Sequence, residues 1–258
     1  MRLATWNVNS VRTRVDRVLD FLGREQVDVL AMQETKVSDE AFPRDPFIDA
    51  GYRVVSHGFD RWNGVAVLSR VGAEDVERGF AGQPTWGDPP VAEARALGVT
   101  CGGVRVWSLY VPNGREVDDP HYTYKLTWLA ALRDAAARWA TPVALVGDWN
   151  VAPLDTDVWD IGSFAGATHV TDDERAALAA FDAVGYTEVS RVHVPDEHTY
   201  TFWDYQRTRF ARDEGMRIDL VYTSAALTSR VTGVQILRDE RKGAGPSDHV
   251  PVVVDIDG

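Results

Sequence analysis

Residues 243–254 read Gly-Ala-Gly-Pro-Ser-Asp-His-Val-Pro-Val-Val-Val, and this stretch indicates both the kind of fold and the place of a site. The run that begins at Val250 is apolar and β-branched, as strands buried on both faces are. Asp248 and His249 directly precede this run, and the Gly-Pro-Ser sequence before them favours a turn. Because neighbouring side chains on a strand point to opposite faces, the acid and the imidazole can share one site only if the chain turns there.

Further buried strands and several helices can be predicted on either side of this stretch. Apolar residues recur at helical spacing over residues 11–22, stopping near Gly23, over 124–139, and over 173–184, which ends at Gly185. Strands and helices mixed in this way predict an α/β fold in which helices cover the outside of sheets. In addition to the run at 250–256, we expect buried strands at residues 27–32, 65–68, 104–111, 143–146 and 218–222.

One short internal repeat suggests that the chain has two related halves. Trp6-Asn7-Val8 and Trp149-Asn150-Val151 each follow a short apolar strand. A match of three residues is weak by itself. If it reflects a repeat, each half presents an asparagine at the end of a strand, and a cleft between paired sheets would be lined by those ends.

The composition indicates one globular domain. The chain has 258 residues, of which 45% are hydrophobic, and no linker or low-complexity segment divides it, so we expect a single domain over residues 1–258. The only cysteine, Cys101, excludes an internal disulfide and a cysteine-ligated metal cluster, and it fits a reducing cytoplasm. No leader and no apolar stretch of membrane length are evident, so we expect a cytoplasmic protein without a membrane partner.

The formal net charge of -12 argues against a nucleic-acid partner, because Lys and Arg must neutralise the phosphate backbone. A bound divalent cation can nevertheless invert the charge of a site locally. The basic residues are also unevenly distributed, and whether they form a solvated loop or a binding surface stays open at this point. The cluster consists of Arg207, Arg209, Arg212 and Arg217, with Arg241 and Lys242 just before the Asp-His pair.

Polar residues that could do chemistry gather at the ends of the predicted strands. Asp219 differs from the others because it lies inside an apolar run, where an unpaired charge is costly, and a histidine would be a natural partner. The remaining inventory consists of carboxylates, amides, one phenol and one imidazole, namely Glu34, Asp148, Asp248, Asn7, Asn150, Tyr110 and His249.

This inventory favours hydrolysis of a phosphate ester. Oxygen-rich sites without cysteine suit magnesium or manganese better than zinc. Such a metal, a carboxylate that activates water and neutral donors aimed at anionic oxygens are what the reaction needs. A Gly-x-Ser-x-Gly elbow and a Gly-rich nucleotide loop are both absent from the sequence.

Seven short motifs follow one another along the whole chain. They are Leu3-Ala4-Thr5-Trp6-Asn7-Val8-Asn9-Ser10, Met32-Gln33-Glu34-Thr35-Lys36, Asn63-Gly64-Val65-Ala66, Tyr110-Val111-Pro112-Asn113-Gly114, Gly147-Asp148-Trp149-Asn150, Arg217-Ile218-Asp219 and Ser247-Asp248-His249. With these motifs the chain closely resembles the exonuclease III family of DNA-repair nucleases, part of the endonuclease/exonuclease/phosphatase superfamily. Each motif alone is weak, but seven in this order are specific.

The resemblance implies a four-layer α/β/β/α sandwich of two packed mixed sheets flanked by helices, with the site at one edge. It implies a magnesium ion, for which manganese could substitute. Glu34 would be the principal metal ligand, with Asp248 and Asn7 near the metal. Tyr110 and Asn113 would contact the scissile phosphate.

The resemblance also implies how water is activated. Asp148 would activate the attacking water and would be held by Asn150, while His249, paired with Asp219, would bind the phosphate or act as the base. Which of Asp148 and His249 takes the proton stays open. Geometry and charge favour Asp148, with a protonated His249 stabilising the transition state.

Repair members of the family grip an abasic deoxyribose in an apolar pocket. The positions that match this pocket are Phe202, Met216 and Ile218, and a tight pocket would exclude a nucleotide that still carries its base. Met216 is flexible, which leaves the balance between abasic-site incision and 3′ trimming open. From position alone we expect Arg115 and the Lys125 region to approach backbone phosphates.

The leading hypothesis is therefore a magnesium-dependent phosphodiesterase that acts on duplex DNA as a monomer, incising 5′ to abasic sites and trimming 3′ ends. One alternative is a phosphatase of the same superfamily that acts on a small or lipid phosphate ester. Another is a non-catalytic homologue that only binds nucleic acid. The complete set of catalytic residues argues against this last alternative.

Overall fold

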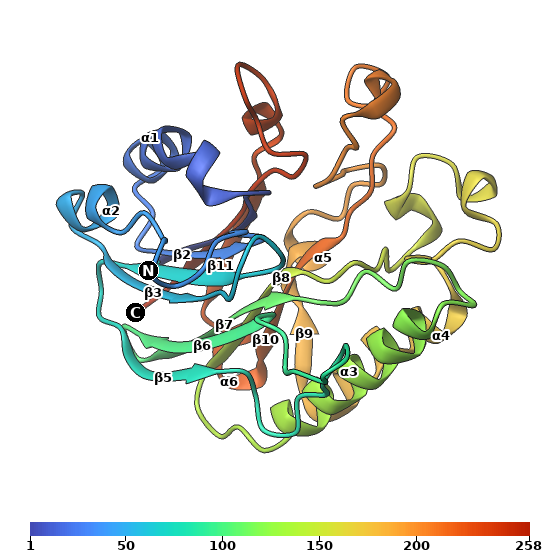
Figure 1. The fold of residues 1–258 in the computed structure, drawn as a ribbon, viewed down its shortest axis with the longest axis horizontal. Coiled ribbons are helices and arrows are strands. Elements are labelled where there is room, and N and C mark those ends of the chain that lie inside the picture. Colours follow the sequence, from blue (N-terminus) through green and yellow to red (C-terminus); the bar gives the residue numbers. More distant parts are fainter.

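Two six-stranded β-sheets pack face to face, and helices cover the outer face of each sheet (Figure 1). The structure, a computed structural model, describes residues 1–258. Apolar side chains fill the space between the sheets, among them Val29 and Val67 from one sheet and Val99 and Val146 from the other. A second apolar cluster lies between one sheet and its helices, and a third lies between the other sheet and its helices. The predicted four-layer α/β/β/α sandwich is therefore confirmed.

Both sheets are mixed, with one parallel pair of strands at the centre and antiparallel neighbours on either side. In spatial order the first sheet consists of β11 (Val231–Ile236), β12 (Val252–Ile256), β1 (Arg2–Asn7), β2 (Val29–Gln33), β4 (Val65–Ser69) and β3 (Arg53–His57). The second sheet consists of β5 (Glu74–Arg78), β6 (Ala96–Cys101), β7 (Val104–Tyr110), β8 (Val143–Asp148), β10 (Asp219–Ser224) and β9 (Tyr186–Glu188).

The helices vary widely in length, and none of them combines the length and apolar character that crossing a membrane requires. The α-helices are α1 (Val15–Glu25), α2 (Asp45–Asp49), α3 (Pro120–Ala136), α4 (Asp172–Ala179), α5 (Val189–His193) and α6 (Ala225–Thr228). Short 3-10 helices are η1 (Val11–Thr13), η2 (Asp155–Asp157), η3 (Ile161–Phe164), η4 (Asp182–Val184), η5 (Gln206–Thr208) and η6 (Arg238–Arg241).

The predicted helices exist, but their ends differ from the prediction. The first begins as η1 and continues as α1 through Gly23, ending where Gln26 adopts a left-handed backbone with φ 52°. Gly23 is exposed and its backbone is helical, so it does not break the helix. The third is divided into α4 and η4.

Among the strands that were not predicted, β5 has the weakest apolar signal, whereas β6 is an interior strand that is almost completely buried. All five residues of β5 are exposed, and its sequence Glu-Asp-Val-Glu-Arg is mostly charged. Charged exposed residues are common on edge strands, because they discourage pairing with another chain. An apolar pattern reports burial, so it does not reveal an edge strand of this kind. The other unpredicted strands are β3, β6, β9 and β11.

The two sheets share one topology, which agrees with the prediction of two related halves. The parallel pair β1/β2 is connected through α1, and the parallel pair β7/β8 through α3, with an antiparallel pair on each side. However, the two copies of the Trp-Asn-Val repeat do not occupy equivalent positions in the two sheets. Asn7 ends the first strand of its parallel pair, whereas Asn150 follows the second strand of the other pair.

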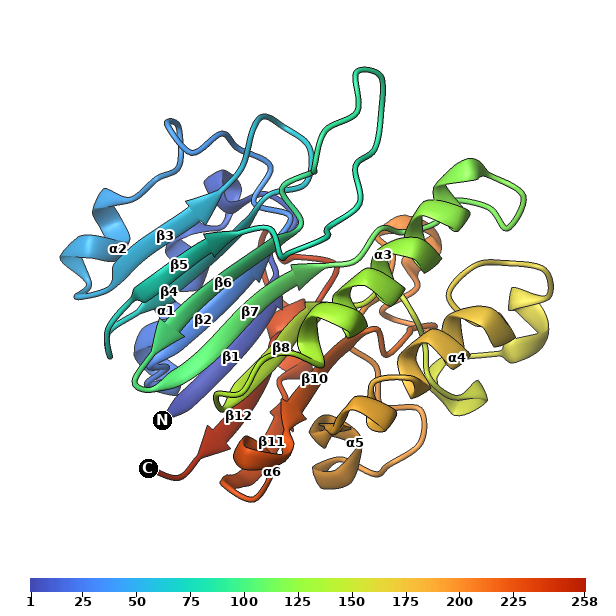
Figure 2. The same cartoon turned by 90° about the horizontal axis from the view of Figure 1, so that it is seen from below.

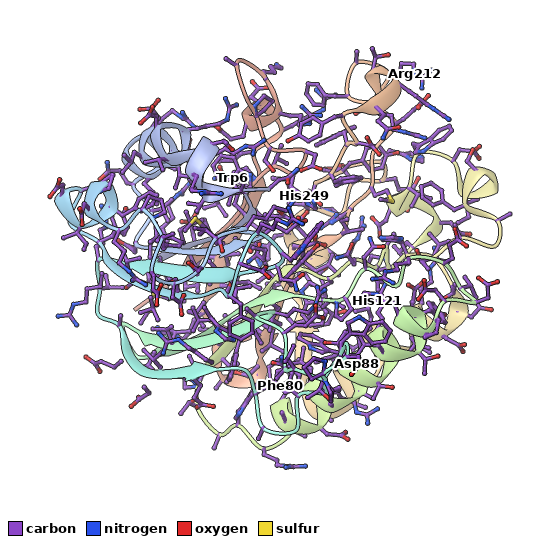
Figure 3. The ribbon with its side chains drawn as sticks, in the orientation of Figure 1. Trp6, Phe80, Asp88, His121, Arg212 and His249 are labelled. Atoms are coloured by element: carbon purple, nitrogen blue, oxygen red, sulfur yellow. The ribbon has the colours of Figure 1, made fainter.

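Three connecting segments project from the same edge of the sandwich (Figure 1). They are residues 155–170, residues 203–216 and residues 237–247, which appear in yellow, orange and dark red. Figure 3 places Arg212 at the outer end of the second segment and His249 nearer the middle of the molecule. From below, the long connection between β5 and β6 also projects beyond the strands (Figure 2).

Candidate active site

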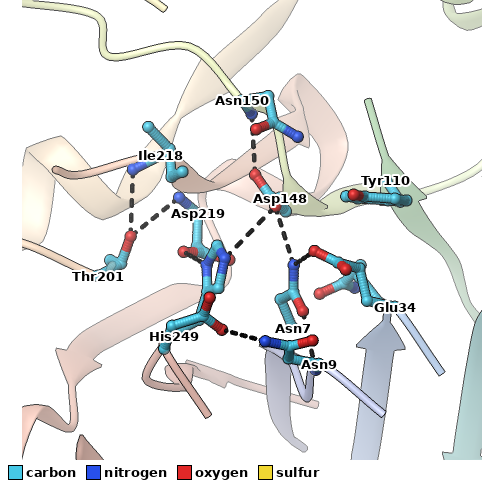
Figure 4. A network of polar contacts seen from close by, with 12 residues as sticks. Asn7, Asn9, Glu34, Tyr110, Asp148, Asn150, Thr201, Ile218, Asp219 and His249 are labelled. Atoms are coloured by element: carbon cyan, nitrogen blue, oxygen red, sulfur yellow. Dashed lines mark hydrogen bonds and ion pairs between the residues drawn. The ribbon is translucent and has the colours of Figure 1, made fainter. Parts of the chain in front are cut away.

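The carboxyl ends of the two central parallel pairs meet at one edge of the sandwich, and the predicted polar residues lie there (Figure 4). Asn7 is the last residue of β1, and Glu34 directly follows β2. Tyr110 and Asp148 end β7 and β8, and Asp219 begins the neighbouring antiparallel strand opposite Asp148. Ligand sites of mixed α/β sheets commonly lie at the carboxyl ends of their strands.

The backbone is unusual at this edge. Glu34 and Asn150 adopt left-handed conformations with φ 50° and 51°. Such conformations cost roughly 1–3 kcal/mol each and tend to occur at functional sites. Gly147 allows β8 to approach β7 closely, because a Cβ atom at this position would lie 1.9 Å from the carbonyl oxygen of Leu109. The close approach sets the position of Asp148, which follows Gly147 directly.

His249 pairs with Asp219 and not with its sequence neighbour Asp248. Its Nδ1 atom lies 2.8 Å from Asp219 Oδ2, and both side chains are buried. Thr201 Oγ1 accepts hydrogen bonds from the backbone nitrogens of Asp219 and Ile218, both at 3.1 Å, and so fixes the start of β10. The predicted pairing is therefore confirmed.

Asp148 is the centre of the hydrogen-bond network in Figure 4. Its Oδ1 atom accepts a hydrogen bond of 2.9 Å from the backbone nitrogen of Asn150. Its Oδ2 atom accepts one of 3.0 Å from Asn7 Nδ2, which also donates to Glu34 Oε1 at 2.8 Å. His249 Nε2 lies 3.7 Å from Asp148 Oδ2. Asn7 thus joins carboxylates of the two sheets.

The proton affinities of Asp148 and His249 are both raised. Burial raises the pKa of Asp148, and Asp219 and Glu34 act in the same direction, although His249 opposes them. Burial alone would lower the pKa of His249, but the carboxylates of Asp219 and Asp148 raise it to about 10. The site therefore holds a carboxylate with increased basicity beside an imidazole that carries a proton at neutral pH.

The donor set at this edge fits a hard divalent cation. Side-chain atoms of Glu34, Asp148 and His249 point into a common region and lie within 4.8 Å of one another. The two carboxylates are the ligands on offer, because a protonated His249 cannot bind a metal. The Lys36 ammonium group lies 2.7 Å from the Glu34 carboxylate, so this carboxylate already attracts a cation. Two carboxylates without a cysteine suit magnesium or manganese.

The predicted metal ligands Asp248 and Asn7 do not join this converging group. Asp248 Oδ1 accepts a hydrogen bond of 3.0 Å from Asn9 Nδ2. The side-chain oxygen of Asn7 accepts one of 3.0 Å from the backbone nitrogen of Asn9, so its amide nitrogen faces Glu34. Of the two predicted carboxylate ligands, Glu34 belongs to the group and Asp248 does not.

A histidine that the sequence analysis did not identify contacts the site. Asn113 Nδ2 lies 3.2 Å from Asn150 Oδ1 and 3.1 Å from His169 Nε2, so its two hydrogens can serve both acceptors. His169 Nε2 also lies 3.2 Å from Asn150 Oδ1, and Nδ1 lies 2.9 Å from Thr168 Oγ1. Burial and the nearby Lys125 lower the pKa of His169 to about 3, so the imidazole is neutral. No local motif marks His169.

The prediction that the Lys125 region approaches DNA phosphates is wrong for Lys125 itself. The side chain is fully buried, and its ammonium group donates to the backbone carbonyls of Asn113 at 3.1 Å and Asn150 at 2.6 Å. It also forms an ion pair with Glu174, which is equally buried. The Thr-x-x-Glu capping signal at the start of α4 could have placed Glu174, but not its partner. Arg115, in contrast, is exposed.

A cavity adjoins the Asp219–His249 pair, and its lining combines apolar side chains with the charged residues Asp204, Arg209 and Glu214. Phe202 and Met216 line it together with Trp159, and its volume is about 270 Å³. The rings of Phe202 and His249 lie 4.8 Å apart. Ile218, the third predicted pocket residue, is only 2% exposed and belongs to the small core cluster behind Phe202 and Met216. The structure thus places two of the three predicted residues on the cavity wall.

The predicted basic cluster is largely neutralised within the protein. Arg209 and Arg212 both form ion pairs with Glu214, at 3.3 Å and 2.7 Å. Arg217 is fully buried and donates to the carbonyl oxygen of Val194. Arg207 is exposed and forms no ion pair, so it is the free cation of this segment. Arg241 is nearly buried, whereas Lys242 is exposed.

Comparisons with known proteins agree with this geometry. Residues 4–249 match the model of the Endonuclease/Exonuclease/phosphatase family. An exodeoxyribonuclease of Bacillus subtilis is 30% identical over 98% of both chains. The structure of an AP endonuclease from Archaeoglobus fulgidus superposes with a TM-score of 0.93 at 33% identity and 100% coverage of both chains. That of a 3′ phosphatase from Neisseria, bound to a product DNA hairpin, has a TM-score of 0.94 at 32% identity, also with 100% coverage of both.

Proposed function

Because the chain belongs to the endonuclease/exonuclease/phosphatase family, we propose that it is a metal-dependent phosphodiesterase that acts on duplex DNA. It incises the strand 5′ to abasic sites and trims 3′ ends by removing 3′ phosphates or terminal nucleotides. The observation that carries the proposal is the convergence of Glu34, Asp148 and the Asp219–His249 pair at one edge of the sandwich. Full-length similarity to an exodeoxyribonuclease, an AP endonuclease and a 3′ phosphatase supports it.

The metal is magnesium, for which manganese can substitute. Glu34 would be its principal ligand. Asn7 and Asp248 would lie beside it, because Asn7 donates to Glu34 and Asn9 connects Asn7 to Asp248. When bound, the ion supplies positive charge that stabilises the anionic oxygens of the phosphate. The Lys36 ammonium beside Glu34 shows that this carboxylate can be held by a cation.

Asp148 accepts the proton of the attacking water. Its Oδ1 atom is held by the backbone nitrogen of Asn150, and burial raises its pKa, which makes it a stronger base. The water oxygen bonds to phosphorus as its proton moves to Asp148, and the bond between phosphorus and the 3′ oxygen breaks. The 3′ oxygen leaves with the bonding electron pair and takes up a proton from solvent. His249, protonated and held by Asp219, donates to a phosphate oxygen and stabilises the charge that develops there.

Residues around this centre bind the substrate. Tyr110 and Asn113 contact the scissile phosphate, and the exposed Arg115 contacts a neighbouring backbone phosphate. Phe202 and Met216 hold the sugar in the cavity next to His249, with Ile218 supporting them from behind. A displaced abasic sugar suits this cavity, because the sugar is small and partly apolar.

Residues 1–258 act as one domain and as a monomer in the cytoplasm. Both sheets contribute to a single site, since Glu34 and Asn7 come from the first sheet and Asp148 from the second. All of the residues assigned to the reaction lie within one chain, so a second copy is not required.

A substrate panel at one enzyme and salt concentration tests the proposed function. The panel contains a duplex with one abasic-site analogue, a duplex with a 3′ phosphate and a duplex with a recessed 3′ end. We expect products with magnesium and none with a chelator. The absence of metal-dependent product from every duplex, together with release of phosphate from a small soluble ester, would favour a phosphatase of the same superfamily.

A further inference from the structure

Lys125 lies behind the candidate active site and is completely buried. It projects from the second turn of α3, and its ammonium group donates to the backbone carbonyls of Asn113 at 3.1 Å and Asn150 at 2.6 Å. The third donor serves the Glu174 carboxylate. All three hydrogens of the ammonium group therefore have an acceptor.

The two carbonyls belong to the residues that connect the fold to the reacting centre. The backbone nitrogen of Asn150 donates to Asp148 Oδ1 at 2.9 Å. Asn113 Nδ2 lies 3.2 Å from Asn150 Oδ1, so the loop after β7 and the loop after β8 touch through their side chains as well. Lys125 holds both loops by their backbone carbonyl groups. It has no contact with the region where Glu34, Asp148 and His249 converge.

Glu174 makes the buried charge tolerable. Its carboxylate also accepts hydrogen bonds from the backbone nitrogens of His169 at 3.0 Å and Thr171 at 3.1 Å, and from Thr171 Oγ1 at 2.8 Å. Burial alone would raise the pKa of Glu174, but Lys125 and these donors keep it below the ordinary value. The charged groups of Lys125 and Glu174 therefore both have hydrogen-bond partners throughout this network.

A buried ion pair is a weak source of stability, since well-packed apolar residues often serve equally well. The ion pair at this position therefore matters more for the orientation of the backbone groups that it contacts than for the stability of the fold. We infer that Lys125, with Glu174 as its counter-ion, is a positioning residue that fixes the Asn113 and Asn150 loops and thereby the orientation of Asp148. The inference rests on the proposed phosphodiesterase function and adds a residue to its machinery.

The test compares the wild-type protein with the double variant Lys125→Met/Glu174→Gln. Glutamine can replace glutamate in the α4 capping box, and the double variant avoids an unpaired buried carboxylate. We expect kcat on a duplex with a 3′ phosphate to be at least about 30-fold lower in the double variant than in the wild type, because small misplacements of reacting groups have effects of this size. KM should change by less than about threefold, since Lys125 does not touch the substrate.

Leu132→Ala is the matched control for loss of stability. Leu132 is buried on the same helix and packs in the outer apolar cluster of the second sheet, so its truncation loosens α3 without touching either loop. Measured at a temperature where it is folded, this variant should keep its kcat. A loss of kcat in Leu132→Ala equal to that in the double variant would overturn the inference, because general destabilisation would then explain both.

Hydrogen exchange provides a readout that does not depend on activity. The backbone amides of residues 111–114 and 149–151 should exchange at least about tenfold faster in the double variant than in the wild type, while amides in the β1/β2 pair should not change. Equal exchange and equal kcat in the two proteins would refute the inference. If the wild-type protein cleaves no substrate, the proposed function fails, and the exchange rates alone decide whether Lys125 holds the loops.

Discussion

At the scale of single residues, the chemistry depends most directly on Asp219 and His249. Asp219 is completely buried, and its Oδ1 atom has no hydrogen-bond partner, so its negative charge is directed at His249 through Oδ2. This charge raises the pKa of His249 against the opposite effect of burial. Removing the charge while keeping the shape isolates its contribution.

Asp219→Asn should lower kcat by about 10²–10⁴-fold, because an asparagine can still contact the imidazole but no longer stabilises its protonated form. The pKa of His249, followed by NMR, should fall from about 10 toward its ordinary value. Asp155→Asn is the control, since the Asp155 side chain is 63% exposed and pairs with Arg175 on the surface. Turnover by Asp219→Asn at the wild-type rate would contradict the assigned role.

Glu34→Gln tests the metal site. Loss of the carboxylate should weaken Mn²⁺ binding, measured by electron paramagnetic resonance, by at least about tenfold. The Mg²⁺ concentration for half-maximal activity should rise in parallel. In Glu40→Gln, which removes an exposed carboxylate elsewhere, both values should stay as in the wild type. Unchanged Mn²⁺ affinity in Glu34→Gln would remove Glu34 from the ligand set.

At the scale of elements, the start of α3 supports the loop that follows β7. Asp119 caps the helix by accepting a hydrogen bond of 2.7 Å from the backbone nitrogen of His121. His121 Nδ1 accepts one of 3.1 Å from the backbone nitrogen of Gly114. Burial, together with Arg95 and Arg115, lowers the pKa of His121 from 6.5 to about 4.

This shift predicts a loss of stability in acid. The unfolded chain protonates His121 below pH 6.5 but the folded protein only below about pH 4, so the contribution is complete above pH 6.5 and decreases as the pH falls through this window. His121→Asn keeps an acceptor oxygen near the position of Nδ1 but does not titrate. Denaturant unfolding at pH 7.5 and pH 4.5 should show a smaller decrease for the variant, and equal decreases would contradict the prediction.

At the scale of the whole molecule, the acidic protein must still attract a polyanion. The formal net charge is -12, and the structure pairs Arg209 and Arg212 with Glu214. The free positive charge of this projecting segment therefore depends on Arg207. The attraction of this segment to DNA then depends on Arg207, and salt should weaken it.

Arg207→Ala should weaken DNA binding in the presence of a chelator and reduce the slope of log K against log salt by about 1, because one phosphate contact is lost. The effect should not depend on the DNA sequence. Arg138→Ala is the control, since Arg138 is exposed beyond the carboxyl end of α3, at the far end of this helix from the loops. An unchanged slope in Arg207→Ala would show that Arg207 does not contact the backbone.

The fold could be predicted because its determinants are local. The apolar runs that became β2, β4, β7, β8, β10 and β12 stand out in the sequence, since central strands are buried on both faces. Edge strands such as β5 lack this signal, because their side chains face water. The observed helix ends differ from the predicted ones by a few residues for a similar reason. Gly23, for example, is exposed, so packing does not require the helix to end there.

For the candidate site, too, some features could be predicted from the sequence and others could not. The sequence alone determined which side chains stand at strand ends and that Asp219, inside an apolar run, needs a partner such as His249. Only the tertiary structure decided that Asn7 bridges Glu34 and Asp148, which is 141 residues away, that Lys125 is buried beneath the loops and that Glu214 neutralises two arginines. Apolar periodicity is a property of neighbouring residues, whereas pairing of charges depends on distances that exist only after the sheets have packed.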